Sequence, residues 1–132
     1  MGLVLADALV HRGLRVSLWG PFPDVVEHLA ATRENPGRMP GFRLDEQVRV
    51  TTNSSELFDN CTMAINAIPS QFIGDVWSRV DGDLPSGCPI VSVAKGVENG
   101  TLRRPSEVLG EAVPSAGAMC ALSGPTIATE AE

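Results

Sequence analysis

Apolar residues along this chain switch between helical spacing and short continuous runs. A helical pattern opens the sequence and leads straight into the apolar run Arg15–Trp19, which is typical of a buried strand. Helical spacing returns between Phe22 and Ala30 and predicts a second helix with its polar side in water. The segment Glu34–Gln47 carries two prolines and two glycines without any period, so we expect a structured loop there.

The same alternation continues through the rest of the chain. Further strands are predicted at Val48–Thr51, Met63–Ile68, Ile90–Ala94 and Ala118–Leu122. Between them the spacing predicts a short helix at Ser54–Asp59, a helix from Phe72 to Val80 that begins near Pro69, and a helix around Val108–Val113. Short strands that are apolar on both faces and alternate with helices indicate a doubly wound α/β fold, with a mostly parallel sheet covered by helices on both faces.

Composition narrows the class of protein. With 132 residues and 43% hydrophobic content, the chain is long enough for one domain. The net charge of −6 argues against nucleic-acid binding, because a surface for phosphate backbones needs a basic stripe. No apolar run is long enough to span a membrane and no secretory signal is visible, so we expect a cytoplasmic protein.

The cysteines and histidines have unremarkable expected roles. Cys61, Cys88 and Cys120 form no C-x-x-C pair, so we predict neither a disulfide framework nor a metal site, and we interpret them as small buried thiols. His11 and His28 are expected on the surface. Trp77 lies on an apolar helical stripe and is expected to be a core or domain-contact residue.

The predicted strand ends carry the candidate chemistry, since open α/β sheets bind ligands outside the carboxyl ends of their strands. Gly, Pro, Ser and Lys follow four of the strands, as in Ala94-Lys95-Gly96 and Leu122-Ser123-Gly124. Glycines let a ligand approach the backbone, and Lys95 is well placed to contact a phosphate or carboxylate. A lysine that simply reaches solvent is the alternative.

The opening helix holds part of a nucleotide-binding signature. The dinucleotide fingerprint is a strand, then G-x-G-x-x-G, then a helix. No such triplet is present, but Gly2 lies directly before an apolar helix, where the third glycine would stand. We therefore expect a Rossmann-type fold whose first strand is missing ahead of Gly2.

Several stretches together resemble the N-terminal domain of NAD(P)-dependent glycerol-3-phosphate dehydrogenases. They are "RVSLWG", "ATRENPGRMPG" followed by "FRL", "VTTNSSEL", "NAIPSQ", "VSVAKGVENGTLRRPSEVL" and "ALSGPTIATE". The combination of an N-P-x-x-x-P-G loop, a K-G-x-E-x-G-T block and an S-G-P-T block is specific. The resemblance implies an oxidoreductase that uses NAD or NADP to interconvert dihydroxyacetone phosphate and sn-glycerol 3-phosphate, a precursor of phospholipids.

The resemblance also implies roles for individual residues. Lys95 matches a lysine that contacts both the nicotinamide end of the cofactor and the substrate, and Gly124 and Thr126 match substrate contacts. Gly2, Pro69 and Ala128 are the other residues expected at the cofactor. The family's catalytic lysine belongs to a helical domain that follows this region. Residues 1–132 are therefore expected to be a partial dinucleotide-binding domain, inactive alone, with no catalytic residue among them; the full-length protein is expected to be a homodimer.

One departure and two alternatives stay open. Pro21 stands where the family often has an arginine near the adenosine phosphate, so the choice between NAD and NADP is not fixed. A related dehydrogenase, such as a ketopantoate reductase or a hydroxyacid dehydrogenase, is one alternative, although the K-G-x-E-x-G-T block speaks against it. The other is a degenerate, non-catalytic α/β interaction module.

Overall fold

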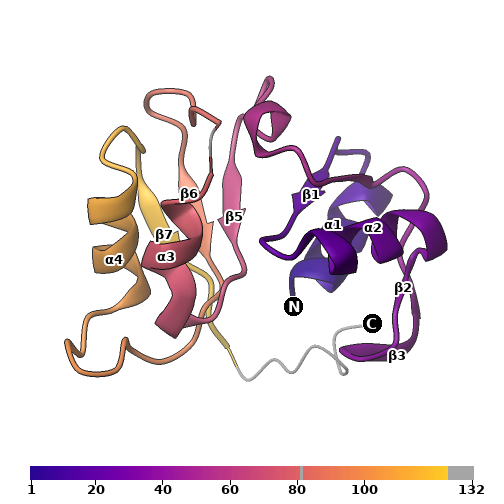
Figure 1. Cartoon of the computed structure of the whole chain (residues 1–132). Helices are drawn as coiled ribbons and strands as arrows, with labels where there is room; N and C mark the ends of the chain where they lie inside the picture. Colours follow the sequence, from indigo (N-terminus) through magenta and orange to yellow (C-terminus); the bar gives the residue numbers. More distant parts are fainter. Residues whose placement is uncertain (81, 125–132) are drawn as a thin grey trace. The chain divides into compact units, whose positions relative to one another are not determined.

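The computed structural model describes residues 1–80 and 82–124, and the chain divides after Leu57 into two compact units. Both units are built from short strands and helices, and each contains at least one parallel pair of strands (Figure 1). The alternation expected from the sequence is confirmed in both.

The first unit contains one parallel pair of strands and two helices. Strand β1 (Ser17–Trp19) lies beside β4 (Arg49–Thr51), and helices α1 (Gly2–His11) and α2 (Pro23–Thr32) connect to them. A short 3-10 helix, η1 (Ser54–Glu56), follows β4. The core of this unit consists of buried residues from both helices and from the segment ahead of β4, namely Ala6, Val10, Leu29, Leu44 and Val48.

The expected loop at Glu34–Gln47 contains a small hairpin, so that prediction was wrong. Strand β2 (Glu34–Asn35) pairs antiparallel with β3 (Met39–Arg43). The prolines and glycines do not prevent pairing, because one Pro-Gly pair occupies the turn, which Arg38 N–H closes by donating to the Asn35 carbonyl at 3.0 Å. Met39 is buried, which anchors the hairpin to the unit.

The apolar stripe of α2 is also narrower than the spacing predicted. Val26 and Leu29 are buried, whereas Val25 and the N-capping Phe22 are exposed. The helix is short; it packs against β4 and β2, and it contributes Leu29 to the core of the first unit. The helical spacing of apolar residues therefore predicts a wider buried face of α2 than the structure has.

The second unit contains a three-stranded parallel sheet in the order β5-β6-β7 (Figure 1). These strands are Ala64–Asn66, Ile90–Ser92 and Met119–Ala121, each shorter than predicted. A 3-10 turn, η2 (Ser70–Phe72), runs into helix α3 (Ile73–Trp77), and α4 (Pro105–Ala112) precedes β7. Helices α3 and α4 pack against each other and α4 packs on β7, around the fully buried residues Ile73, Ile90 and Leu109.

The individual side chains follow most of the expectations. His11 and His28 are exposed as predicted. Trp77 is half-buried and stacks on Phe58 with ring centroids 6.0 Å apart, which confirms its role in the core. The prediction that the cysteines are buried holds only for Cys88. Cys61 is half-buried, and Cys120 is exposed on β7, the outermost of the described strands of its sheet.

Candidate functional site

Three strands of the second unit end level with one another. Register pairs Asn66 of β5 with Ser92 of β6, and Ser92 with Ala121 of β7. Two further bonds extend the ladder past the strands, from Val93 N–H to the Asn66 carbonyl at 3.0 Å and from Leu122 N–H to the Ser92 carbonyl at 2.8 Å. The three following segments therefore leave the sheet together at the carboxyl ends of the strands, which is where ligands bind in open α/β sheets. This end of the sheet is called the sheet edge below.

Lys95 lies on this edge and reaches across to the segment after β7. It is the one lysine of the sequence, and its exposed side chain donates from Nζ to the carbonyl oxygen of Gly124 at 3.0 Å. Two residues that were predicted to share a site, from the β6 and β7 ends, are thus in direct contact. A positive charge is held at the rim of the sheet edge by this bond.

The backbone next to Lys95 carries no side chain at Gly96. Gly96 has φ +84°, and a Cβ added there would meet only Ser70 Oγ, at 3.9 Å. The exposed Pro69 precedes the first turn of η2 on the same edge. A left-handed backbone without a side chain is the arrangement that lets a partner approach closely.

The remaining predicted site residues lie elsewhere in the chain. Gly2 is the first residue of α1 in the first unit, and that helix has no acidic residue in its first turn and no side-chain cap. A first turn whose amides lack a side-chain cap is compatible with an anion. Thr126 and Ala128 lie outside the described residues.

A buried network of hydrogen-bonded polar side chains holds the ends of β5 and β6 in place. Asn66 and Ser92 are 1% and 3% exposed, and Asn66 Nδ2 donates to Ser92 Oγ at 3.1 Å. Trp77 Nε1 donates to Asn66 Oδ1 at 3.0 Å, and Ala94 N–H donates to Ser92 Oγ at 3.3 Å. These buried polar groups are hydrogen-bonded to one another instead of to water, and they fix the backbone just ahead of Lys95.

A single glutamine clasps the loop that follows Lys95. Gln71 Nε2 donates to the Val97 carbonyl at 2.8 Å, while Gln71 Oε1 accepts from the Asn99 N–H at 2.7 Å. Ser70 Oγ also lies 3.5 Å from the Val97 carbonyl. Both ends of one amide thus hold the loop against the turn after β5.

Hydrogen bonds and ion pairs of charged residues hold the other end of this loop. Glu98 accepts hydrogen bonds from Thr101 Oγ1 and from the Arg103 guanidinium, and these bonds hold the pKa of the Glu98 carboxyl below its ordinary value of 4.5. Arg103 also pairs with Glu111 of α4. The loop is therefore attached both to the β5 turn and to a helix.

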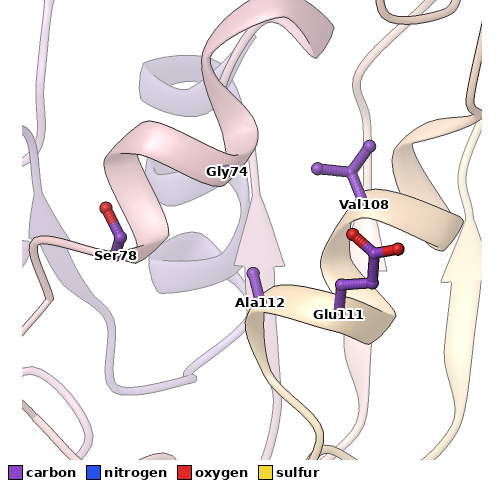
Figure 2. A pocket seen from close by; sticks show the side chains of 5 residues that line it. All are labelled: Gly74, Ser78, Val108, Glu111 and Ala112. Carbon is purple, nitrogen blue, oxygen red and sulfur yellow. The ribbon is translucent and has the colours of Figure 1, made fainter. Parts of the chain in front are cut away.

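A separate shallow hollow of about 220 Å³ lies between α3 and α4 (Figure 2). Small side chains and Glu111 line it, and none of the predicted site residues does. Within the described ranges, no group of three His, Cys, Asp or Glu side chains is placed to hold a metal ion. Among the same residues, no helix has the length and apolar character that a membrane crossing needs.

Known proteins match nearly all of this chain. The family described as NAD-dependent glycerol-3-phosphate dehydrogenase N-terminus matches residues 1–132. The chain belongs to this family. It is 36% identical to a glycerol-3-phosphate dehydrogenase [NAD(P)+] of Citrifermentans bemidjiense and 39% identical to one of Chlorobium limicola, in each case over 98% of this chain and 39% of the relative.

Solved structures confirm the predicted Rossmann-type fold. A glycerol-3-phosphate dehydrogenase of Coxiella burnetii superposes with a TM-score of 0.79 at 25% identity, over 97% of this chain and 39% of that one. The enzyme of Saccharomyces cerevisiae gives a TM-score of 0.76 at 22% identity, over 98% and 40% of the two chains. The chain therefore spans about two fifths of the length of the relatives that it matches.

Lys95 and the open backbone beside it suit the anionic and amide groups of an NAD(P) cofactor. Lys95 supplies a point charge, and the open backbone at Gly96 allows close approach. These features agree with the family's use of NAD(P).

The sequence interpretation missed the residues that position the edge. Asn66, Ser92 and Gln71 were not singled out, although each makes hydrogen bonds that fix a strand end or the loop. A signal was present: Asn66 and Ser92 are polar residues inside otherwise apolar runs, at positions that a parallel register brings level. Buried polar residues of this kind need partners, and so they predict one another.

Proposed function

We propose that the gene product containing this chain transfers a hydride between NAD(P)H and dihydroxyacetone phosphate to give sn-glycerol 3-phosphate. The observation that carries this proposal is the bond between Lys95 Nζ and the Gly124 carbonyl, because it joins two expected site residues at the sheet edge of a chain that belongs to the family. The relatives that match over 98% of the chain bear the name glycerol-3-phosphate dehydrogenase [NAD(P)+].

In this proposal residues 1–132 form part of the dinucleotide-binding domain. They cover 39% of the length of the named relatives. A helical domain outside these residues supplies the catalytic lysine and most of the grip on the substrate phosphate. Residues 1–132 therefore have no turnover by themselves.

The proposal assigns the residues to two ligands. Gly2, Pro69, Lys95 and Ala128 contact the cofactor, and Lys95, Gly124 and Thr126 contact the substrate. Support comes from the open backbone beside Lys95, from the uncapped first turn of α1, and from the order of the motifs along the chain.

The physical role of these residues is binding and orientation. NAD(P)H, when bound, supplies the hydride. Lys95 attracts an anionic or carbonyl oxygen, and its bond to Gly124 keeps the ammonium at a fixed place on the edge. The Asn66–Ser92 network and the Gln71 clasp limit the movement of the backbone on either side of Lys95.

The proposal extends to the setting of the protein. The complete gene product works in the cytoplasm as a homodimer, takes small phosphorylated substrates, and binds no nucleic acid, in keeping with its net charge of −6. The choice between NAD and NADP is decided by competition between the two cofactors in a binding assay.

An assay of the complete gene product tests the proposal. With NADH or NADPH, dihydroxyacetone phosphate is expected to be reduced, whereas ketopantoate and simple 2-oxo acids are not. Reduction of ketopantoate alone would assign the chain to another dehydrogenase. Failure to bind either cofactor would instead support a degenerate interaction module.

A further inference from the structure

Two thiols lie close together at the amino ends of β5 and β6. Lys95 lies at the opposite end of these strands. Cys61 precedes β5 and Cys88 precedes β6. Their sulfur atoms lie 3.9 Å apart, and Cys88 Sγ is also 3.9 Å from the Cys61 carbonyl oxygen. Cys61 is half-buried and Cys88 is buried, so only the first is open to reagents in solution.

Hydrogen bonds hold both cysteines in this arrangement. Cys61 Sγ donates to the Met63 carbonyl at 3.3 Å, and Cys88 N–H donates to the Pro85 carbonyl at 2.9 Å. Ala64 N–H donates to the Pro89 carbonyl at 3.0 Å and ties the two segments together. The sulfurs need to approach by about 2 Å to reach the length of a disulfide bond, a distance that side-chain rotation and a small backbone adjustment supply.

We propose that Cys61 and Cys88 form a reversible modification site, which closes to an intramolecular disulfide on reaction with a low-molecular-weight disulfide such as oxidised glutathione. The Cys61 thiolate attacks one glutathione sulfur and releases one glutathione thiol. The Cys88 thiolate then attacks the Cys61 sulfur of the mixed disulfide and releases the second. In total, two protein thiols are oxidised to one disulfide, and one oxidised glutathione is reduced to two thiols.

The surroundings keep both thiols reduced under ordinary conditions. Burial, together with the neighbouring Cys88, raises the pKa of the Cys61 thiol, so little thiolate is present at neutral pH and the first step is slow. A reducing compartment keeps both thiols free. The bond forms when oxidised glutathione accumulates.

A Cys61–Cys88 disulfide would affect the amino ends and the carboxyl ends of the strands differently. It joins segments that are 27 residues apart and thereby restricts the unfolded chain. Lys95 and Gly124 lie at the carboxyl ends of the strands, away from the thiols. We therefore expect a more stable second unit with an unchanged ligand edge, and this expectation does not depend on the proposed function.

Peptide mapping of the complete gene product tests the inference. Under native conditions, incubation with oxidised glutathione is expected to give a Cys61–Cys88 bridged peptide and to raise Tm by about 5 °C, and dithiothreitol is expected to reverse both changes. Cys61→Ser is expected to abolish the bridge and the rise in Tm. Cys120→Ser serves as the matched control and should retain both, because its exposed thiol lies on β7.

Three results would overturn the inference. The first is recovery of Cys61 and Cys88 as unmodified thiols or as separate glutathione adducts. The second is a bridge that forms only after denaturation with urea. The third is a bridge with no change in Tm relative to Cys61→Ser.

Discussion

Gly117 has no room for a side chain, and the substitution Gly117→Ala tests the packing ahead of β7. A Cβ at this position would lie 2.2 Å from the Gly87 carbonyl oxygen and 2.7 Å from its carbon. Ordinary contact begins at 3.4 Å, and both neighbours are backbone atoms that cannot rotate away. The backbone angles of Gly117 lie outside the left-handed region, so space alone requires the glycine.

The cost follows from what must move. Separating the two segments by more than 1 Å breaks the bond from Gly117 N–H to the Cys88 carbonyl at 2.9 Å and the bond from Gly87 N–H to the Ser115 carbonyl at 3.0 Å. Each contributes about 1 kcal/mol, and overpacking adds about 1–3 kcal/mol. We expect Gly117→Ala to lower the free energy of unfolding by about 3–5 kcal/mol, a large share of the stability of a small domain.

Urea denaturation followed by circular dichroism measures this change, with Gly110→Ala as the matched control. Gly110 lies within α4, and the nearest atom to an added Cβ is Met119 Sδ at 4.0 Å. Alanine is the better helix former, so the control should be more stable than the wild type by about 0.5–1 kcal/mol. Equal stabilities of Gly117→Ala and wild type would refute the close approach of these two segments.

Two further predictions concern hydrogen bonds at the surface. Gln71→Ala should reduce the hydrogen-exchange protection of the Asn99 amide about tenfold, because it removes the acceptor 2.7 Å away; unchanged protection would contradict the clasp. The backbone carbonyl of Asp7, and after it the Asp7 carboxylate, raises the pKa of His11. Protonated His11 therefore stabilises the folded state fully below pH 6.5, and this contribution is lost as the pH rises through the folded-state pKa. An NMR titration should show a lower His11 pKa in Asp7→Asn, and an unchanged value would exclude the carboxylate as a cause.

The sequence pattern predicted the alternation of helices and strands because period and apolar content depend on local residue order. It failed at Glu34–Gln47, where the pairing of β2 with β3 depends on a hairpin turn that composition alone marks only as irregular. Strand lengths were overstated because the apolar runs continue past the last paired residue, as at Ala94 beyond β6.

The candidate site was predicted only in part. Lys95 and Gly124 were expected at one edge, because parallel strands end together, and they are in contact. Two of the residues that position this edge are polar positions inside apolar runs, but which positions face one another follows only from the strand register. The pairing of Asn66 with Ser92 and the reach of Gln71 across 26 residues to Val97 follow from the folded sheet.

The central claim is that Lys95 holds an anionic or carbonyl group of the ligands, and the substitution Lys95→Met tests it most directly. In the complete gene product, loss of a charge-assisted hydrogen bond is expected to lower kcat/KM for dihydroxyacetone phosphate about 100-fold, with Tm little changed. Arg79→Met removes one positive charge from an exposed position just after α3 and should retain kcat/KM within about threefold. A Lys95→Met variant with the same kcat/KM as Arg79→Met would contradict the account.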